Sequence, residues 1–180
     1  NHIGVPLTLL SIDDSYEIAI VEMGANHVGE IEFLSNIALP THGFITNVGK
    51  AHLEGFGSFD GVKKTKGELY DFISKTGGTL FLQADNEHLV GMAAQCTFAK
   101  VVKYGFSETN DIIGRLITAN PYLSIGWRQL GSSENFEVTT NLTGSYNTEN
   151  ILAAIAVGLE FGMNPQKINE GISSYIPKNN

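Results

Sequence analysis

Short apolar runs alternate with segments of helical period through the first 106 residues, and this alternation constrains the fold more than any other feature. A helical pattern follows each of the first three runs, which predicts strand–helix units whose strands pair in parallel, with helices on both faces of the sheet. The predicted strands are 17–22, 43–48, 78–83 and 101–106, and the predicted helices are 6–10, 29–38, 58–73 and 86–95.

The pattern changes after residue 111, where polar and apolar positions alternate in three segments separated by Asn-Pro and Gly-Ser-Ser turns. These segments, 112–119, 122–129 and 135–141, predict an antiparallel meander that forms a small second sheet beside the main one. Helical patterns return at 148–161 and 164–175. The predicted fold class is therefore α/β, a mostly parallel sheet flanked by helices, with a small antiparallel sheet.

Composition excludes several classes of partner. A net charge of −8 argues against nucleic acid and against an anionic membrane, since both favour a basic face, although Mg²⁺ could neutralise the phosphates of a nucleotide. Cys96 is the only cysteine, which excludes an intrachain disulfide and suits a reducing cytoplasm. No apolar run reaches the roughly 18–20 residues that span a bilayer. We expect a cytoplasmic, monomeric protein with one domain.

Two residues beyond the carboxyl ends of predicted strands are candidate metal ligands, because ligands of open α/β sheets bind at that edge. Glu22 ends the first predicted strand, and a carboxylate can bind Mg²⁺; the alternative is an acid that caps a loop or helix. His52 follows the second strand, and its imidazole could bind a metal; the alternative is a solvated loop histidine. His27 is a weaker candidate of the same kind.

Lys63, Lys64 and Lys66 cluster on the predicted helix 58–73, where a solvated face is the simplest interpretation. The alternative is that one lysine is desolvated, loses its proton and reacts with CO₂, which gives a carbamate whose oxygens suit Mg²⁺.

Asn147 and Asn150 open the predicted helix 148–161 and share one face of it. An amide carries a donor and an acceptor, which match the N6/N7 edge of adenine. Helix capping would suffice to explain Asn147, but it explains Asn150 less well. A phosphate loop of the form G-x-x-x-x-G-K-[ST] occurs nowhere in the 180 residues.

Five segments of the chain occur together in an order that one known family shares. They are Val-Glu-Met-Gly-Ala-Asn-His, Thr-Asn-Val-Gly-Lys-Ala-His-Leu-Glu-Gly-Phe-Gly-Ser, Lys-Thr-Lys-Gly-Glu-Leu, Gln-Ala-Asp-Asn and Gly-Ser-Tyr-Asn-Thr-Glu-Asn-Ile-Leu-Ala-Ala. With these segments the chain resembles the central ATPase domain of the Mur ligase family, whose members are ATP-dependent ligases, over nearly its whole length. The Ala-Asn-His and Ala-His-Leu-Glu-Gly-Phe-Gly-Ser segments are most similar to the members that add D-alanyl-D-alanine to UDP-N-acetylmuramoyl-tripeptide.

The resemblance implies roles for individual residues. Glu22 corresponds to the acidic Mg²⁺ ligand of the family, and His52 to its histidine ligand for the second Mg²⁺. Lys66 corresponds to the lysine that is carbamylated in these enzymes, so that Lys66 and His52 would serve catalysis. Tyr146 stands where many members have histidine. On the nucleotide side, the resemblance implies that Asn147 and Asn150 bind adenine as a pair. It also implies that Asn86 lies near the nucleotide and that Asn47 lines the cleft.

The resemblance also implies ATP and Mg²⁺ as cofactors and an acyl phosphate intermediate. It assigns residues 1–177 to the central domain and 178–180 to a linker toward a C-terminal domain, with the phosphate loop upstream of Asn1. Both ends are then expected to be cut from a longer polypeptide, and the 180 residues alone are expected to fold without ligating. A folylpolyglutamate synthase-like domain and a non-catalytic nucleotide-binding module remain as alternatives.

Overall fold

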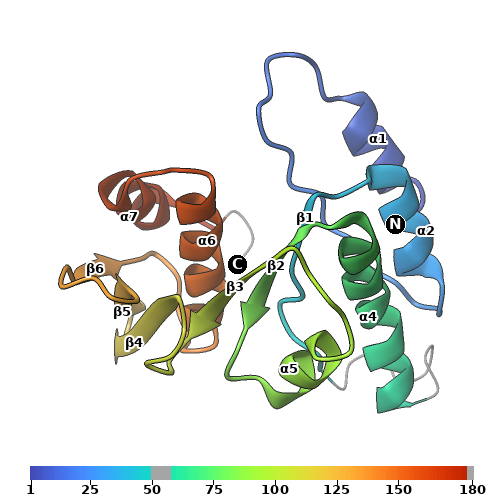
Figure 1. The fold of residues 1–180 in the computed structure, drawn as a ribbon. Helices are drawn as coiled ribbons and strands as arrows, with labels where there is room; N and C mark the ends of the chain where they lie inside the picture. Colours follow the sequence, from blue (N-terminus) through green and yellow to red (C-terminus); the bar gives the residue numbers. More distant parts are fainter. Residues whose placement is uncertain (50–57, 178–180) are drawn as a thin grey trace. The chain divides into compact units, whose positions relative to one another are not determined.

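The structure, a computed structural model, describes residues 1–49 and 58–177. The described chain divides into two compact units (Figure 1). Unit 1 comprises Asn1–Leu80 with Gly91–Lys100, and unit 2 comprises Phe81–Val90 with Val101–Asn180. Each unit is built around its own helices and strands.

Unit 1 is organised around helix α4 (Phe59–Thr76), which packs against β1 (His42–Gly43) and against α2 (Glu30–Ala38). Helix α1 (Gly4–Leu10) packs on α2 in turn. The chain then enters β2 (Thr79–Gln83), which pairs with β1 in parallel. The apolar side of α4, with the buried Val62, Tyr70 and Ile73, supplies much of the core of this unit.

Local signals in the sequence determine where α4 begins and ends. The Ser58 side chain caps the helix by accepting a hydrogen bond of 3.1 Å from the Gly61 N–H. At the other end Gly77 adopts a left-handed conformation with φ 69°, and the Gly78 N–H reaches back to the Ile73 carbonyl at 2.8 Å. Glycine is the residue that adopts this conformation at least cost, so the helix stops there.

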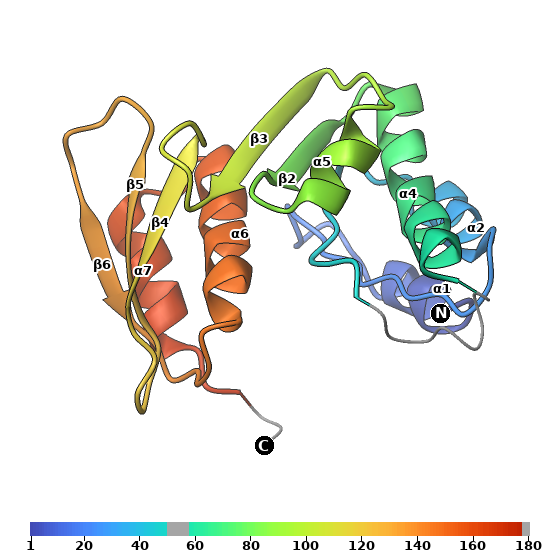
Figure 2. The ribbon, with the colours of Figure 1, turned by 90° about the horizontal axis from the view of Figure 1, so that it is seen from below.

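Unit 2 consists of strands with two helices packed against them. Helix α6 (Asn147–Glu160) packs on β4 (Ile112–Thr118), and α7 (Pro165–Ser174) packs on β6 (Phe136–Thr139), as Figures 1 and 2 show. The indole N–H of buried Trp127 donates to the Asn169 side chain of α7 at 2.9 Å. The other elements after β2 are α5 (Glu87–Ala93), β3 (Lys100–Gly105) and β5 (Ser124–Gln129).

The strands form one six-stranded mixed sheet in the order β1-β2-β3-β4-β5-β6. Strands β4, β5 and β6 pair antiparallel, which confirms the predicted meander. The expectation that the meander forms a second sheet beside the main one is wrong. Tyr104 of β3 pairs in parallel with Ile112 of β4, and this pairing joins the antiparallel strands to the parallel ones.

Two predicted strands differ from the structure. Residues 17–22 form no strand, and the side chains of Ile18 and Ile20 are 48% and 78% exposed. The predicted strand 43–48 is reduced to the two residues of β1. A strand needs a neighbouring strand that hydrogen-bonds to its backbone N–H and C=O groups. Within residues 1–49 and 58–177, segment 17–22 belongs to no strand, and segment 43–48 belongs to a strand only at Gly43.

The predicted helices agree well with the observed ones. Asn164 caps α7 by accepting a 2.8 Å hydrogen bond from the Lys167 N–H, and Pro165 opens the helix as predicted. None of the helices in the described residues combines the length and apolar character needed to cross a membrane.

The close packing of α6 on β4 gives a first test. A Cβ atom on Gly114 would lie 2.5 Å from a methyl carbon of Leu152, which is fully buried. We therefore expect Gly114→Ala to lower the free energy of unfolding by about 1–3 kcal/mol, measured by urea denaturation of the 180-residue chain. Gly91→Ala on α5 is the control, since a Cβ there meets nothing within 4 Å. An unchanged urea midpoint for Gly114→Ala would contradict this packing.

Candidate functional site

The structure separates the three clustered lysines of α4 by their surroundings. The Lys63 ammonium lies 2.7 Å from an Asp60 carboxylate oxygen and 5.2 Å from the centre of the Phe59 ring. Lys64 is exposed. Lys66 is half-buried, and its Nζ donates a 2.7 Å hydrogen bond to the backbone carbonyl of Asn47. Only Lys66 of the three combines burial with a neutral oxygen partner.

Burial lowers the pKa of the Lys66 ammonium, because the charged form is poorly solvated at this position. The neutral amine is the form that attacks electrophiles such as CO₂. Lys66 therefore has surroundings consistent with a reactive amine, and its conversion to a carbamate stays a prediction.

The other predicted metal ligands are described only in part. Glu22 lies in an irregular segment, and its side chain is exposed. His52 lies in 50–57, outside the described residues. Among residues 1–49 and 58–177, His, Cys, Asp and Glu side chains nowhere gather in a group of three that could hold a metal ion. Glu22 offers the hard oxygen that Mg²⁺ prefers, whereas Lys66 would fit a metal only as a carbamate.

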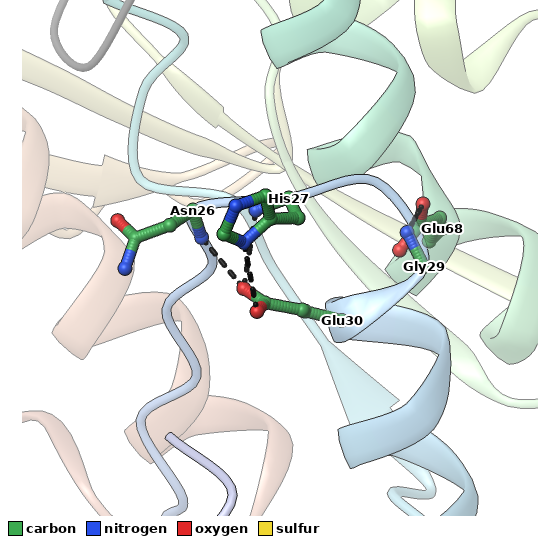
Figure 3. A network of polar contacts seen from close by, with 5 residues as sticks. All are labelled: Asn26, His27, Gly29, Glu30 and Glu68. Carbon is green, nitrogen blue, oxygen red and sulfur yellow. Dashed lines mark hydrogen bonds and ion pairs between the residues drawn. The ribbon is translucent and has the colours of Figure 1, made fainter. Parts of the chain in front are cut away.

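The loop that follows Glu22 is held by two carboxylates (Figure 3). Glu30 accepts hydrogen bonds from the N–H groups of Asn26 at 2.7 Å and His27 at 3.2 Å, and these bonds lower the pKa of its carboxyl group. Glu68 of α4 accepts from the N–H groups of Gly29 at 2.6 Å and Glu32 at 3.0 Å.

His27, the weaker candidate metal ligand, lies in this loop beside Glu30. The His27 ring is largely exposed and lies 3.2 Å from the other Glu30 carboxylate oxygen (Figure 3). The structure therefore gives His27 a carboxylate partner within its own loop. Glu68 was missed by sequence reasoning, although it stands only two residues after Lys66.

Asn147 and Asn150, in unit 2, form a hydrogen-bonded pair on the first turn of α6. The Asn150 amide donates to the Asn147 side-chain oxygen at 3.1 Å, and the Asn147 amide donates to the Thr143 carbonyl at 2.9 Å. This confirms that the two side chains share a face. The N-cap position falls on Tyr146, so the alternative that Asn147 caps the helix is wrong. Each amide has further hydrogen-bonding capacity beyond these bonds.

Asn86 has a clear structural role in unit 2. Its side-chain oxygen accepts from the N–H groups of His88 at 3.1 Å and Leu89 at 3.2 Å, which caps α5. Its own N–H donates to the Gln83 side-chain oxygen at 2.6 Å. The side chain of Asn47, in unit 1, is exposed, and its backbone carbonyl is the partner of Lys66.

Two carboxylates of unit 2 were also missed from the sequence. Asp85, which follows β2, accepts from the N–H groups of Phe106 and Ser107 and from the Asn110 amide. It lies so close to Gly105 that a Cβ there would be 2.2 Å from its oxygen. Burial raises the pKa of the Glu149 carboxyl between the two asparagines, and the charge of Asp85 raises it further.

Comparison with known proteins identifies the family. The family description "Mur ligase middle domain" matches residues 1–158. The chain belongs to the Mur ligase middle domain family. The match includes Glu22, Lys66 and both asparagines of the pair, whose functional roles stay predictions.

Individual members of the Mur ligase family resemble the chain over almost all its length. The UDP-N-acetylmuramoyl-tripeptide–D-alanyl-D-alanine ligase of Escherichia coli K12 is 32% identical over 97% of the chain. A crystal structure of MurF from Acinetobacter baumannii covers 98% of the chain with a TM-score of 0.85 and 26% identity. MurF ligase from Thermotoga maritima in complex with ADP covers 97% with a TM-score of 0.78 and 25% identity.

The similarity covers part of each relative. The chain spans 38% of the E. coli ligase, 38% of the A. baumannii chain and 39% of the T. maritima chain. The chain is therefore matched almost throughout, and more than half of each relative lies outside the comparison.

The raised pKa of Glu149 gives a test of the α6 N-terminus. Its folded-state pKa lies above the unfolded value of about 4.3, so its contribution to stability is full below that pH and is lost as the pH rises through the folded pKa. Glu149→Gln avoids this loss. We expect the melting temperature of Glu149→Gln to rise relative to wild type between pH 4 and pH 7, measured by circular dichroism.

Glu134→Gln, at an exposed carboxylate of the β5–β6 turn, is the control for the loss of one acid. If both variants change relative to wild type by the same amount at each pH, the buried environment of Glu149 is refuted.

Proposed function

We propose that the chain is the ATP-binding domain of a ligase that joins D-alanyl-D-alanine to UDP-N-acetylmuramoyl-tripeptide. The observation that carries the proposal is the half-buried Lys66 amine, bound to the Asn47 carbonyl, in a chain that resembles such ligases over 97% of its length. The site includes Glu22, Lys66 and His52 on the metal side, with His52 outside the described residues.

The proposed reaction has two steps. The tripeptide carboxylate attacks the γ-phosphorus of ATP, the bond to the bridging oxygen breaks, and an acyl phosphate and ADP form. The amine of D-alanyl-D-alanine then attacks the acyl carbon through a tetrahedral intermediate, loses a proton and expels phosphate. A carboxylate must approach a polyanion in the first step, so the main physical demand is the neutralisation of charge. Mg²⁺ supplies that neutralisation when it is bound.

Lys66 acts in this proposal as a carbamate. Its neutral Nζ attacks CO₂, a nitrogen–carbon bond forms and a proton is released, which replaces an ammonium with an anion. The carbamate oxygens, the Glu22 carboxylate and the His52 imidazole would hold the metal. These residues position charge and are not expected to act as general acid or base.

The nucleotide side of the proposal lies in unit 2. Asn147 and Asn150 present amides suited to the adenine edge, and Asn86 lies near the nucleotide. The ADP complex of the T. maritima relative supports a nucleotide site in this domain. The 180 residues contain no phosphate-loop motif of the form G-x-x-x-x-G-K-[ST].

We further propose that residues 1–177 form this domain and that residues 178–180, outside the described residues, begin a linker. The protein would act as a cytoplasmic monomer on small-molecule substrates.

An assay of the protein made from the complete open reading frame tests the proposal. We expect phosphate release only when ATP, Mg²⁺, UDP-N-acetylmuramoyl-tripeptide and D-alanyl-D-alanine are all present. Lys66→Ala should lower kcat by about a hundredfold or more, because an anion that organises the metal is lost. The control is Lys64→Ala, at an exposed lysine of the same helix, which should stay within about twofold of wild type.

Other outcomes would replace the proposal. Turnover with a folate and glutamate in place of the muramoyl and dipeptide substrates would identify a folylpolyglutamate synthase-like ligase. ADP binding without turnover on any of these substrates would identify a non-catalytic nucleotide-binding module.

A further inference from the structure

Helix α4 contacts two loops of unit 1 with two different side chains. Lys66 and Glu68 are two residues apart, a rotation of roughly 200° about the helix axis, so they leave the helix on nearly opposite sides. Lys66 donates to the Asn47 carbonyl, in the segment that follows β1. Glu68 accepts from the start of α2, in the segment that follows Glu22. The same turn of helix therefore joins the lysine of the proposed metal site to the loop that carries its acid.

Helix α2 lacks a cap of its own at its N-terminus. Its N-cap residue is Gly29, which has φ 91° and no side chain to accept hydrogen bonds. The first N–H groups of a helix need an acceptor from elsewhere. Glu68 supplies it with both oxygens. One oxygen accepts from the Gly29 N–H at 2.6 Å (Figure 3), and the other accepts from the Glu32 N–H at 3.0 Å. The negative charge also lies at the positive end of the helix dipole.

The contacts of Glu68 extend to Glu22 through α2. Met23, next to Glu22, accepts a 3.9 Å hydrogen bond at its sulfur from Ser35, a fully buried residue of α2. The loop from Met23 to Gly29 is thus attached to α2 at both ends. Apolar packing holds α2 against α4, but packing alone permits small slides and rotations, whereas two directed hydrogen bonds define one position.

We propose that Glu68 is a positioning residue, which holds the Glu22 loop in register with Lys66 so that both can bind the same metal ion. This inference rests on the proposed function of Glu22 and Lys66. Glu68 itself touches neither metal nor substrate in the proposal. It acts on the metal through the start of α2, as residues outside a coordination sphere orient the ligands within it.

Three variants of the protein from the complete open reading frame test the proposal. Glu68→Gln keeps the size of the side chain but sets an amide donor against one of the two N–H groups. Glu68→Asp keeps the charge and withdraws the carboxylate by one methylene group, and it serves if Glu68→Gln does not fold. Asp60→Asn removes an exposed acid from the first turn of α4, where its partner is Lys63, and is the matched control.

The main readout is the dissociation constant of Mn²⁺ in the presence of ADP, measured by electron paramagnetic resonance of the free ion. We expect Glu68→Gln, or Glu68→Asp, to weaken Mn²⁺ binding about tenfold or more, and Asp60→Asn to change it less than twofold. The Mg²⁺ concentration for half-maximal activity should rise in parallel, while kcat at saturating Mg²⁺ falls much less.

A lower melting temperature with Mn²⁺ affinity within twofold of wild type would show that Glu68 only stabilises the fold, and it would overturn the proposal. Absence of Mn²⁺ binding by the wild-type protein would overturn it as well. If the wild type binds Mn²⁺ without ligating, the proposed reaction fails, and the Glu68 variants still decide the positioning role by their Mn²⁺ affinity.

Discussion

The burial of one side of α4 is the interaction on which unit 1 depends. Val62, Tyr70 and Ile73 enter the core, and this packing leaves the polar side chains of the helix at fixed positions beside the neighbouring segments. Lys66 is partly desolvated as a consequence, and Glu68 reaches the start of α2. Packing therefore provides both the lowered pKa of one lysine and the geometry of its surroundings, from a single helix with 18 residues.

Unit 2 relies on a comparable contact between α6 and β4. The absence of a side chain at Gly114 lets Leu152 pack closely against the strand, and this holds the first turn of α6 in place. That turn carries the Asn147–Asn150 pair and the partly buried Glu149. The amide pair thus stands on a helix that packs against β4 and α7.

Much of the fold could be predicted because its signals are local. Ser58 and Asn164 cap helices that begin where the sequence indicated, and the meander follows from alternation and turn residues. The segment 17–22 has the same apolar character as a buried strand, but its pairing depends on a partner strand that local sequence does not specify.

The site was predictable to a lesser degree. The shared face of Asn147 and Asn150 follows from helical spacing, whereas the distinction of Lys66 from Lys63 and Lys64 depends on tertiary burial, and only the family resemblance indicated it. Glu68 and Asp85 were missed for a related reason. Their hydrogen-bond partners lie far away in the sequence, and no local pattern records such contacts.

We propose that Lys66, as a carbamate, and Glu22 bind one metal ion in a nucleotide-dependent ligase. A crystal structure of the protein from the complete open reading frame, grown with ADP and Mn²⁺ in a buffer that contains CO₂, would show whether they do. We expect planar density beyond Lys66 Nζ and an anomalous Mn²⁺ peak within about 2–2.3 Å of a carbamate oxygen and a Glu22 oxygen. An unmodified Lys66 that still donates to the Asn47 carbonyl, with Mn²⁺ and ADP bound away from Glu22, would contradict it.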